Sequence, residues 1–173
     1  AVEGRLLDGG RRVKEGELPE GWRWQKIEDI AETIGGVTKG RDLAGKRTVT
    51  LPYLRVANVQ RGKLELEVIK EIEILQSEIE KYRLLSGDIV LTEGGDWDKL
   101  GRSAIWRDQI PNCIHQNHIF RARVKTVDVS PEWLMYYTNS ENGQNYFKEA
   151  SKQTTNLASI NLTQLRACPI PIP

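Results

Sequence analysis

The most informative stretch of this sequence is TTNLASINLTQLRACPIPIP, residues 154–173. It begins as a polar, uncharged loop and continues as a short helical turn, for which Asn161 is the expected N-cap and Leu162 and Leu165 the apolar side. It ends in alternating proline and isoleucine, which cannot be helical because each proline removes a backbone donor and favours an extended residue before it. We expect this strip to lead the backbone out of the domain rather than to complete its core.

Length and composition indicate a single globular domain. The 173 residues are 39% hydrophobic and 28% charged, a balance typical of chains that bury a core. We expect residues 1–18 to be a flexible tail and residues 19–173 to form the domain. No apolar run approaches the ~20 residues of a membrane span, and no secretory signal pattern is present. Cys113 and Cys168 lie far apart and suit reduced thiols, so we expect a cytoplasmic protein without membrane contact.

The net charge of +1 conceals three blocks of charge. Residues 38–63 carry seven basic side chains and one acidic one, residues 64–98 carry ten acidic and three basic, and residues 99–125 carry six basic and one acidic. If the two basic blocks meet in space, they form a positive face of the kind that binds polyanions. Composition alone favours ordinary solvated charge.

Periodicity predicts a mixture of strands and helices. Trp22 and Trp24 suit an extended strand, and apolar spacing over residues 26–34 predicts an amphipathic helix closed by Gly35 and Gly36. Further strands are expected at 53–59, 64–75, 89–92, 103–106 and 115–124, and further helices at 77–82 with Ser77 as cap, from Ser130 onward, and at 142–151. This order favours a single α+β domain with a mainly antiparallel twisted sheet flanked by short helices.

No catalytic constellation emerges from the motifs. The spacing of Asp96, Asp98 and Lys99 misses by one residue the arrangement expected of a metal-dependent nuclease. His115 and His118 are three apart in an expected strand, so they point to opposite faces, one to the core and one to solvent. Phosphate-binding glycine loops and an adenine methyltransferase motif are missing. We therefore predict no enzymatic activity, no cofactor and no metal.

Several polar loops carry the side chains that contact nucleic acids. Lysine and arginine bind phosphates, arginine pairs with guanine, and asparagine and glutamine pair with adenine. The candidate DNA-binding residues are Thr38, Lys39, Arg41, Lys46, Arg47, Asn58, Gln60, Arg61, Lys63, Lys99, Arg102, Lys152, Gln153, Thr154, Thr155 and Asn156. Each loop alone is weak evidence. Together they favour a nucleic-acid partner without separating DNA from RNA.

Six motifs follow one another along the chain: LPEGW at 18–22 leading into IEDIA at 27–31, PYLRVANV at 52–59, GDIVLT at 87–92, GRSAI at 101–105, NHIFR at 117–121, and residues 161–173. With these motifs the chain resembles a target recognition domain from the specificity (S) subunit of a type I restriction-modification system. The resemblance covers about residues 18–173, and the ordered set of motifs is more specific than any one of them.

The resemblance implies a non-catalytic, sequence-specific reader of double-stranded DNA. In this family an S subunit carries two such domains separated by long spacer helices, and each domain reads one half of a bipartite site. Methyltransferase (M) subunits bind the S subunit, and a restriction (R) subunit joins for cleavage. The proline-isoleucine strip would lead to a spacer helix. The base-reading residues vary within the family, so the candidate residues above rest on loop chemistry alone.

Two other functions stay open from the sequence. The acidic stretch 65–80 and the aromatic helices around 133–147 would form the working surface of a protein-interaction module without nucleic-acid binding, although core packing is the simpler explanation of those aromatic side chains. A divergent nuclease would depend on Asp96 and on Mg²⁺.

Overall fold

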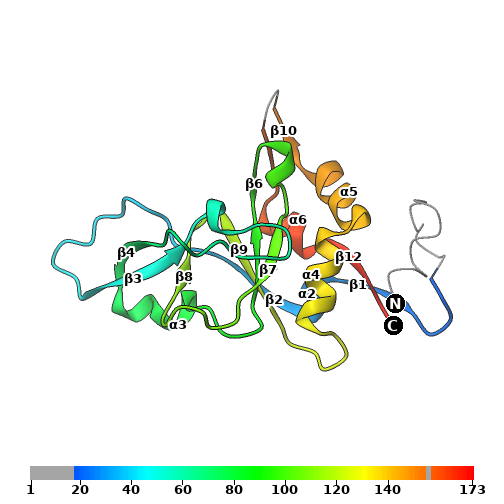
Figure 1. The fold of residues 1–173 in the computed structure, drawn as a ribbon, viewed down its shortest axis with the longest axis horizontal. Helices are drawn as coiled ribbons and strands as arrows, with labels where there is room; N and C mark the ends of the chain where they lie inside the picture. The colour runs from blue at the N-terminus through cyan, green and yellow to red at the C-terminus, as the bar shows by residue number, and fades with distance from the viewer. Residues whose placement is uncertain (1–17, 155–156) are drawn as a thin grey trace.

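The structure is a computed structural model that describes residues 18–154 and 157–173. Residues 1–17, which make up nearly all of the predicted tail, lie outside the described part. The elements are β1 (Arg23–Lys26), α2 (Ile27–Ile30), β2 (Ala31–Gly35), β3 (Thr48–Leu54), η1 (Val56–Asn58), β4 (Lys70–Leu75), η2 (Gln76–Glu78), α3 (Ile79–Tyr82), β5 (Ile89–Thr92), β6 (Gly94–Gly95), η3 (Trp97–Lys99), β7 (Ser103–Ile105), β8 (Ile114–His115), β9 (Ile119–Val124), α4 (Pro131–Asn139), α5 (Glu141–Ala150), β10 (Lys152–Gln153), β11 (Ala158–Ser159), α6 (Leu162–Arg166) and β12 (Pro169–Ile172). Figure 1 shows an elongated molecule with β3 and β4 at one end and β1 and β12 at the other.

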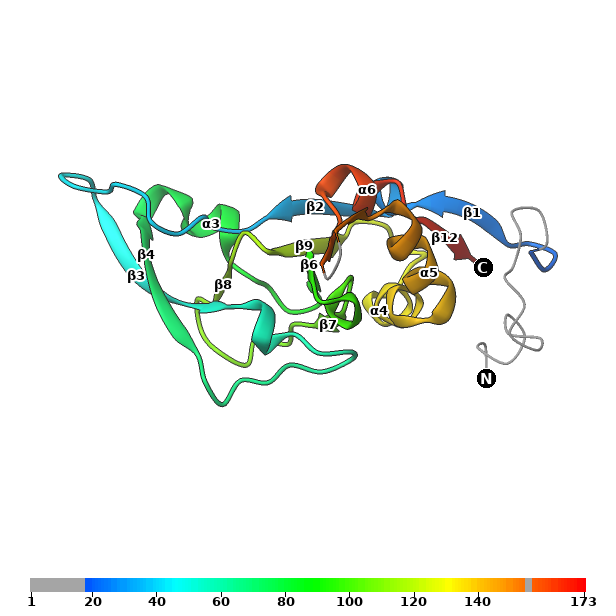
Figure 2. The ribbon, with the colours of Figure 1, turned by 90° about the horizontal axis from the view of Figure 1, so that it is seen from above.

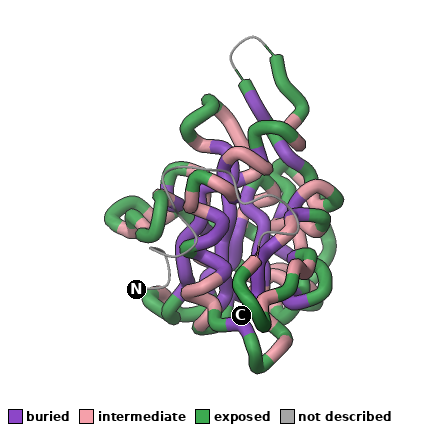
Figure 3. The backbone as a smooth tube through the Cα atoms, turned by 90° about the vertical axis from the view of Figure 1, so that its right-hand side faces the viewer, coloured by how far each residue is buried: buried purple, intermediate pink, exposed green. Residues whose placement is uncertain are grey.

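A four-stranded antiparallel sheet, ordered β2-β9-β5-β7, forms the centre of the molecule. Ile89 and Leu91 of β5 belong to the core cluster that includes Leu134 of α4 and Phe147 of α5. Val90 belongs to a second cluster, as expected when alternate residues of a strand face opposite sides of the sheet. Buried segments therefore gather in the middle of the molecule (Figure 3). The predicted α+β class with a mainly antiparallel sheet is confirmed.

A second sheet, ordered β4-β3-β8, extends the molecule away from this core. β3 is antiparallel to β4 over six residue pairs and parallel to β8 over two. Val37, Leu51, Tyr53, Ile74 and Ile114 form its small core. Among the described residues, no helix is long and apolar enough to cross a membrane.

The proline-isoleucine strip completes the core, so the expectation that it leaves the domain is wrong. β12 pairs antiparallel with β1, which places Ile170 opposite Gln25 and Pro171 opposite Trp24. Ile170 and Ile172 are fully buried. Because proline stands at every second position, only the isoleucines can supply backbone N–H donors in this strand. The Pro171 carbonyl faces away from β1 and accepts a hydrogen bond from Trp133 Nε1 (2.8 Å).

The predicted helix at 26–34 is wrong over most of its length. Only α2 is helical, and β2 follows it at once, pairing with β9 from Ala31 opposite Val124 to Gly35 opposite Phe120. The apolar residues whose spacing suggested a long helix lie partly in the single turn of α2 and partly in the strand β2. Residues 31–35 form a strand because they pair with β9, about 90 residues later in the chain. Tertiary contacts of this kind often override local periodicity in short segments.

Other predicted strands and helices also differ from the observed ones in where they begin or end. The strand predicted at 53–59 begins earlier, as β3, and gives way to η1 after Leu54. The strand predicted at 115–124 is divided between β8 and β9, which join different sheets. Ser77 does not cap the helix at 77–82; instead the Glu78 carboxylate accepts a bond from Leu75 N (3.2 Å).

Two predicted helix starts are confirmed by their caps. Ser130 Oγ accepts a hydrogen bond from Trp133 N (3.1 Å), with Pro131 in the first turn. Asn161 Oδ1 accepts one from Gln164 N (2.9 Å), while Gln164 Oε1 accepts one from Asn161 N (2.8 Å). This reciprocal capping box stabilises α6, which directly precedes the closing strand.

Candidate nucleic-acid interface

Three polar segments that are distant in sequence meet at one end of the central sheet. They are the turn at 60–63, the loop at 94–102, and the hairpin of β10 and β11, and we call them the loop cluster. β11 pairs with β6, so the hairpin is attached to the 94–102 loop through a small sheet. Arg61 Nη2 donates to the Asp98 carbonyl (3.1 Å), which attaches the turn to the same loop. β6 and β10 project together from the body (Figure 1).

Gly94 permits the close approach of the hairpin. It lies opposite Ser159 in the pairing of β6 with β11, and a Cβ at this position would lie 2.0 Å from the carbonyl oxygen of Ala158. Beside it, Ile160 N donates to the Glu93 carbonyl (3.0 Å). A residue with a side chain would therefore separate the two segments.

Two arginines place excess positive charge within the loop cluster. Arg102 is only 8% exposed, and its Nη1 donates to Gln60 Oε1 (2.5 Å), while Gln60 Nε2 donates to the Ala57 carbonyl (3.2 Å). Burial, together with repulsion from Arg102, lowers the pKa of Arg61, and the attraction of Asp98 opposes this. Because guanidinium groups remain charged at ordinary pH, this arrangement favours an incoming anion.

Three lysines add exposed charge to the loop cluster. Lys63 pairs with Glu65 (3.3 Å), and both side chains are well exposed. The Lys99 ammonium bonds to the Asp96 carboxylate, and this bond lowers the pKa of Asp96. Lys152 is exposed. Exposed ion pairs are weak, so phosphates can compete for these lysines.

The β10–β11 segment contains four more candidate residues after Lys152. Gln153 Nε2 donates to a carbonyl near the end of α5 (2.9 Å), and Thr154 Oγ1 donates to the Leu157 carbonyl (3.4 Å). Both side chains are exposed, so their bonds leave them accessible. Thr155 and Asn156 lie outside the described residues.

The candidate residues of the 38–47 loop lie apart from the loop cluster. This loop is the cyan segment at the far end of the molecule, beyond β3 (Figure 2). Arg41 forms a two-pronged pair with Glu78, with Nη1–Oε1 at 2.7 Å and Nη2–Oε2 at 2.8 Å. The hydrogen bond from Arg41 lowers the pKa of Glu78 and raises that of Arg41. Arg41 therefore anchors the loop to η2.

The other polar side chains of this loop face solvent. Lys39 Nζ lies 5.0 Å from the ring centroid of Tyr53, a cation–π distance. Lys46 Nζ makes one long contact, to a backbone carbonyl at 3.5 Å. Thr38 and Arg47 are exposed. The loop thus presents cations at a second place, remote from the loop cluster.

Asn58 has a structural role. It is 3% exposed, and its Oδ1 accepts a bond from Arg55 N (2.9 Å). Its Nδ2 donates to the carbonyls of Glu65 (2.7 Å) and Val68 (3.1 Å). With donors and acceptor used inside the fold, Asn58 has no free edge to offer a base.

Two arginines of the 99–125 block are paired with carboxylates inside the fold rather than presented on a positive face. Arg121, 2% exposed, pairs with Glu32 (2.8 Å) on the neighbouring strand. Arg123 pairs with the 1% exposed Asp88 through two bonds of 2.7 and 2.8 Å. These two arginines are therefore unavailable to a polyanion, whereas the exposed cations of the loop cluster and of the 38–47 loop remain available.

The two histidines divide as expected, one in the core and one in solvent. His115 is fully buried, its Nδ1 lies 2.8 Å from the Ile119 carbonyl, and burial lowers its pKa to about 4. His118 is half exposed, and its Nδ1 lies 2.5 Å from Glu93 Oε2. Among residues 18–154 and 157–173, no group of three or more histidine, cysteine or acidic side chains is arranged to hold a metal ion.

Trp97 lies in the loop cluster but is not among the residues predicted to bind DNA. Trp97 begins η3 and is 39% exposed. A signal was available, because a lone tryptophan between two aspartates, after two glycines, is poorly suited to a core.

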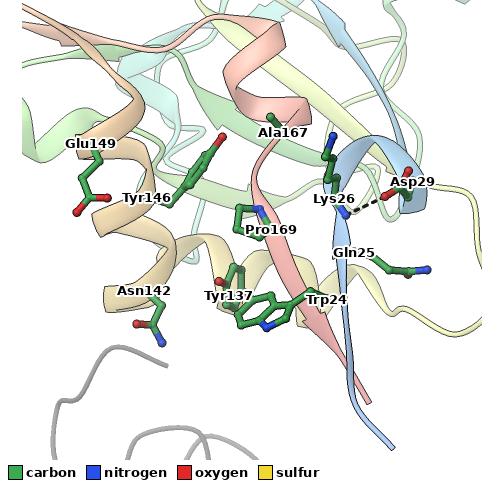
Figure 4. A pocket seen from close by; sticks show the side chains of 10 residues that line it. All are labelled: Trp24, Gln25, Lys26, Asp29, Tyr137, Asn142, Tyr146, Glu149, Ala167 and Pro169. Carbon is green, nitrogen blue, oxygen red and sulfur yellow. Dashed lines mark hydrogen bonds between the residues drawn. The ribbon is translucent and has the colours of Figure 1, made fainter. Parts of the chain in front are cut away.

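A groove of about 600 Å³ lies away from the candidate residues, between α5 and the β1–α2 segment (Figure 4). It is lined by Trp24, Gln25, Lys26, Asp29, Tyr137, Asn142, Tyr146, Glu149, Ala167 and Pro169. None of these was predicted to contact DNA.

The sequence matches a family model and curated relatives. The model for the type I restriction modification DNA specificity domain matches residues 19–173. The chain is 29% identical over 165 residues to the putative type I restriction enzyme MjaX specificity subunit of Methanocaldococcus jannaschii, across 94% of this chain and 38% of that protein. It is 24% identical over 178 residues to the type I restriction enzyme EcoKI specificity subunit of Escherichia coli, across 100% of this chain and 37% of that protein.

Solved structures share the fold. The HsdS subunit from Thermoanaerobacter tengcongensis superposes with a TM-score of 0.64 at 19% identity, over 92% of this chain and 40% of that one. A chain from a structure of complex assembly and conformational transition in the type I R-M system gives 0.60 at 19% identity, over 93% and 36%. The chain thus spans well under half of these relatives. Since the family model covers nearly all of the described residues, this chain belongs to the family of type I restriction modification DNA specificity domains.

Proposed function

We propose that this domain reads one half of a bipartite double-stranded DNA site as part of a type I restriction-modification specificity subunit. Family membership supports a role in DNA specificity. The chain covers 38% and 37% of two curated specificity subunits, a share that suits one of two recognition domains. The single observation that carries the proposal for this chain is the convergence of three polar, basic segments in the loop cluster.

Within the loop cluster, each basic residue has a distinct role. Arg61 is the base-reading residue, because it is exposed and held at one atom by Asp98, with its remaining donors available for guanine. Lys63, Lys99 and Lys152 bind phosphates. Arg102 contributes positive charge from a buried position beneath the surface, and its hydrogen bond positions Gln60. Thr154 and Gln153 contribute adaptable polar contacts at the hairpin.

The 38–47 loop makes a second contact with the same duplex. Arg47, Lys46, Lys39 and Thr38 bind the sugar-phosphate backbone there, while Arg41 holds the loop in place through Glu78. Two separated basic contacts fix the orientation of a duplex better than one, and orientation is what phosphate contacts provide.

The proposed assembly has further partners. Methyltransferase subunits carry the chemistry and bind the specificity subunit, and a restriction subunit joins for cleavage, all in the cytoplasm. The domain contributes recognition and no catalysis. In the proposed assembly, a spacer helix of the specificity subunit would connect this domain to a second recognition domain.

The test uses the full specificity subunit assembled with its methyltransferase subunits. The target sequence is read from the positions that the complex methylates, and duplex binding is then measured at several salt concentrations. Arg61→Ala should weaken binding of the target by ~1–3 kcal/mol and relax preference at one position. Lys152→Ala should weaken all sequences alike and reduce the salt slope by about one.

The matched control is Arg107→Ala. Arg107 is exposed and paired with Glu132 (2.9 Å), and it follows the end of β7 remote from the loop cluster. This variant should keep the target preference of the original. If Arg61→Ala, Arg47→Ala and Lys152→Ala all bind the target as the original does, the proposed interface is wrong.

A further inference from the structure

The loop cluster exposes an aromatic side chain, Trp97, which has no role in the proposed binding of phosphates and guanine. Trp97 is 39% exposed and Leu157 is 53% exposed. Ala158, next to Leu157, pairs with Gly95, two residues before Trp97. Both apolar side chains therefore come from the same end of the small sheet. Tryptophan left in water forgoes the free energy of burial, so its exposure at a basic surface points to a partner.

The backbone holds Trp97 in a fixed position. Lys99 N donates to the Asp96 carbonyl (2.8 Å), which closes the turn around Trp97. Gly101 N donates to the Thr92 carbonyl (3.1 Å), and Thr92 Oγ1 also bonds to the Lys99 carbonyl. A side chain presented by a braced turn loses little conformational freedom on binding, which is the property of an anchor residue.

The turn is braced from a second direction by the residue proposed to read a base. Arg61 Nη2 donates to the Asp98 carbonyl, one residue after Trp97 (3.1 Å). The guanidinium is therefore held against the backbone of the turn that carries Trp97. When Arg61 reaches the edge of a base pair, Trp97 is brought to the same groove.

We infer that Trp97 reads the 5-methyl group of a thymine in the major groove, next to the base contacted by Arg61. This inference rests on the proposed function. The major groove presents the thymine methyl as its apolar feature, and apolar side chains contact it. The Lys99 ammonium lies beside the Asp96 carboxylate on the same turn, so its positive charge offsets that carboxylate near the duplex.

The experiment is a double-mutant cycle on the assembled complex. One axis is Trp97→Ala, and the other replaces each thymine of the target half-site in turn by deoxyuridine, which removes only the methyl group. At one thymine, the replacement should weaken binding of the original protein roughly fourfold, the value of one buried methyl group. Trp97→Ala should bind the two DNAs equally, and Trp97→Phe should restore part of the difference.

Tyr136→Ala is the matched control, because Tyr136 is a 55% exposed aromatic residue on α4. It should respond to deoxyuridine as the original does. Target binding by Trp97→Ala equal to the original, an undiminished response of Trp97→Ala to every deoxyuridine, or a half-site without thymine would each overturn the inference. Loss of binding in Arg61→Ala together with any of these results would leave the proposed function standing. Unchanged target binding in Trp97→Ala, Arg61→Ala, Arg47→Ala and Lys152→Ala would overturn both the inference and the proposed function.

Discussion

At the residue scale, the central sheet holds charges inside the fold. Asp88 is 1% exposed and accepts three hydrogen bonds, two from Arg123 (2.7 and 2.8 Å) and one from Leu85 N (2.8 Å). The bond to Asp88 raises the pKa of Arg123. A buried carboxylate is tolerated only when its oxygens are satisfied in this way.

Replacing Asp88 with alanine should destabilise the domain. Its removal leaves Arg123 without a carboxylate partner, with one remaining bond to the Arg83 carbonyl (3.3 Å), and leaves Leu85 N without an acceptor. We expect a loss of roughly 3 kcal/mol, the lower end of the range for breaking a buried pair, because Arg123 is itself partly exposed. Urea unfolding measures this. Glu80→Ala breaks the exposed pair with Arg83 and should leave the midpoint nearly unchanged; a similar shift in both variants would contradict the argument.

The pair of Arg41 and Glu78 should make the stability of the domain depend on pH. Because the hydrogen bond from Arg41 lowers the pKa of Glu78 below its unfolded value of 4.5, the native state binds fewer protons than the unfolded one. The stabilisation is therefore complete above pH 4.5 and is lost as pH falls through the lower, folded pKa.

A comparison of the original with Glu78→Gln measures this contribution. The difference in unfolding free energy between the two should be constant at neutral and mildly acidic pH and should shrink towards zero in strong acid. Glu80→Gln, an exposed neighbour, should show no such trend. A difference that grew on acidification would mean that the sign is wrong.

At the element scale, the pairing of β1 with β12 closes the domain. The two strands come from opposite ends of the described chain and bury Ile170 and Ile172 completely. Ile170 belongs to the same core cluster as Phe147 and Leu165. The closing strand thus supports the helices that cover the central sheet.

Truncating Ile170 should therefore be costly. Ile170→Ala is expected to lower the free energy of unfolding by ~2–5 kcal/mol, the range for removing a large aliphatic side chain from a core. Chemical denaturation measures it. Val127→Ala is the control, because Val127 is fully exposed and should change stability little. If Ile170→Ala were as mild as the control, the strip would be an appendage, as the sequence first suggested.

The capped helix starts at Ser130 and Asn161 were predicted correctly, whereas the secondary structure of residues 31–35 was not. The caps at Ser130 and Asn161 place α4 and α6 because a side chain and a backbone amide three residues away suffice. The segment 31–35 is a strand because β9 lies beside it, which no window of nearby residues reveals.

At the scale of the whole molecule, the two basic surfaces are separated along its length (Figure 2). If the domain reads one half of a bipartite site, as proposed, it should depend on a second domain for affinity. Connecting two domains turns the second binding event into an intramolecular one.

The assembled specificity subunit should therefore bind a duplex with both half-sites ~10²–10⁴-fold more tightly than a duplex with one. Fluorescence anisotropy on the two duplexes measures the ratio. Changing the spacing between the half-sites should abolish the advantage while leaving binding to each half-site intact. Equal affinity for both duplexes would argue against a bipartite target.

The sequence by itself determined the family, the α+β class, the helix caps and the polar, basic character of the loops, because these depend on residue types and short spacings. Only the tertiary structure decided which loops meet. It brings residues 60–63 and 94–102 to the hairpin and leaves the 38–47 loop apart. It also engages the side chains of Asn58 and Arg41 in hydrogen bonds within the protein and leaves Trp97 exposed. The physical reason is that strand pairing and burial join residues far apart in the chain, so the partner of a charge or an aromatic ring is set by the fold and not by its neighbours in sequence.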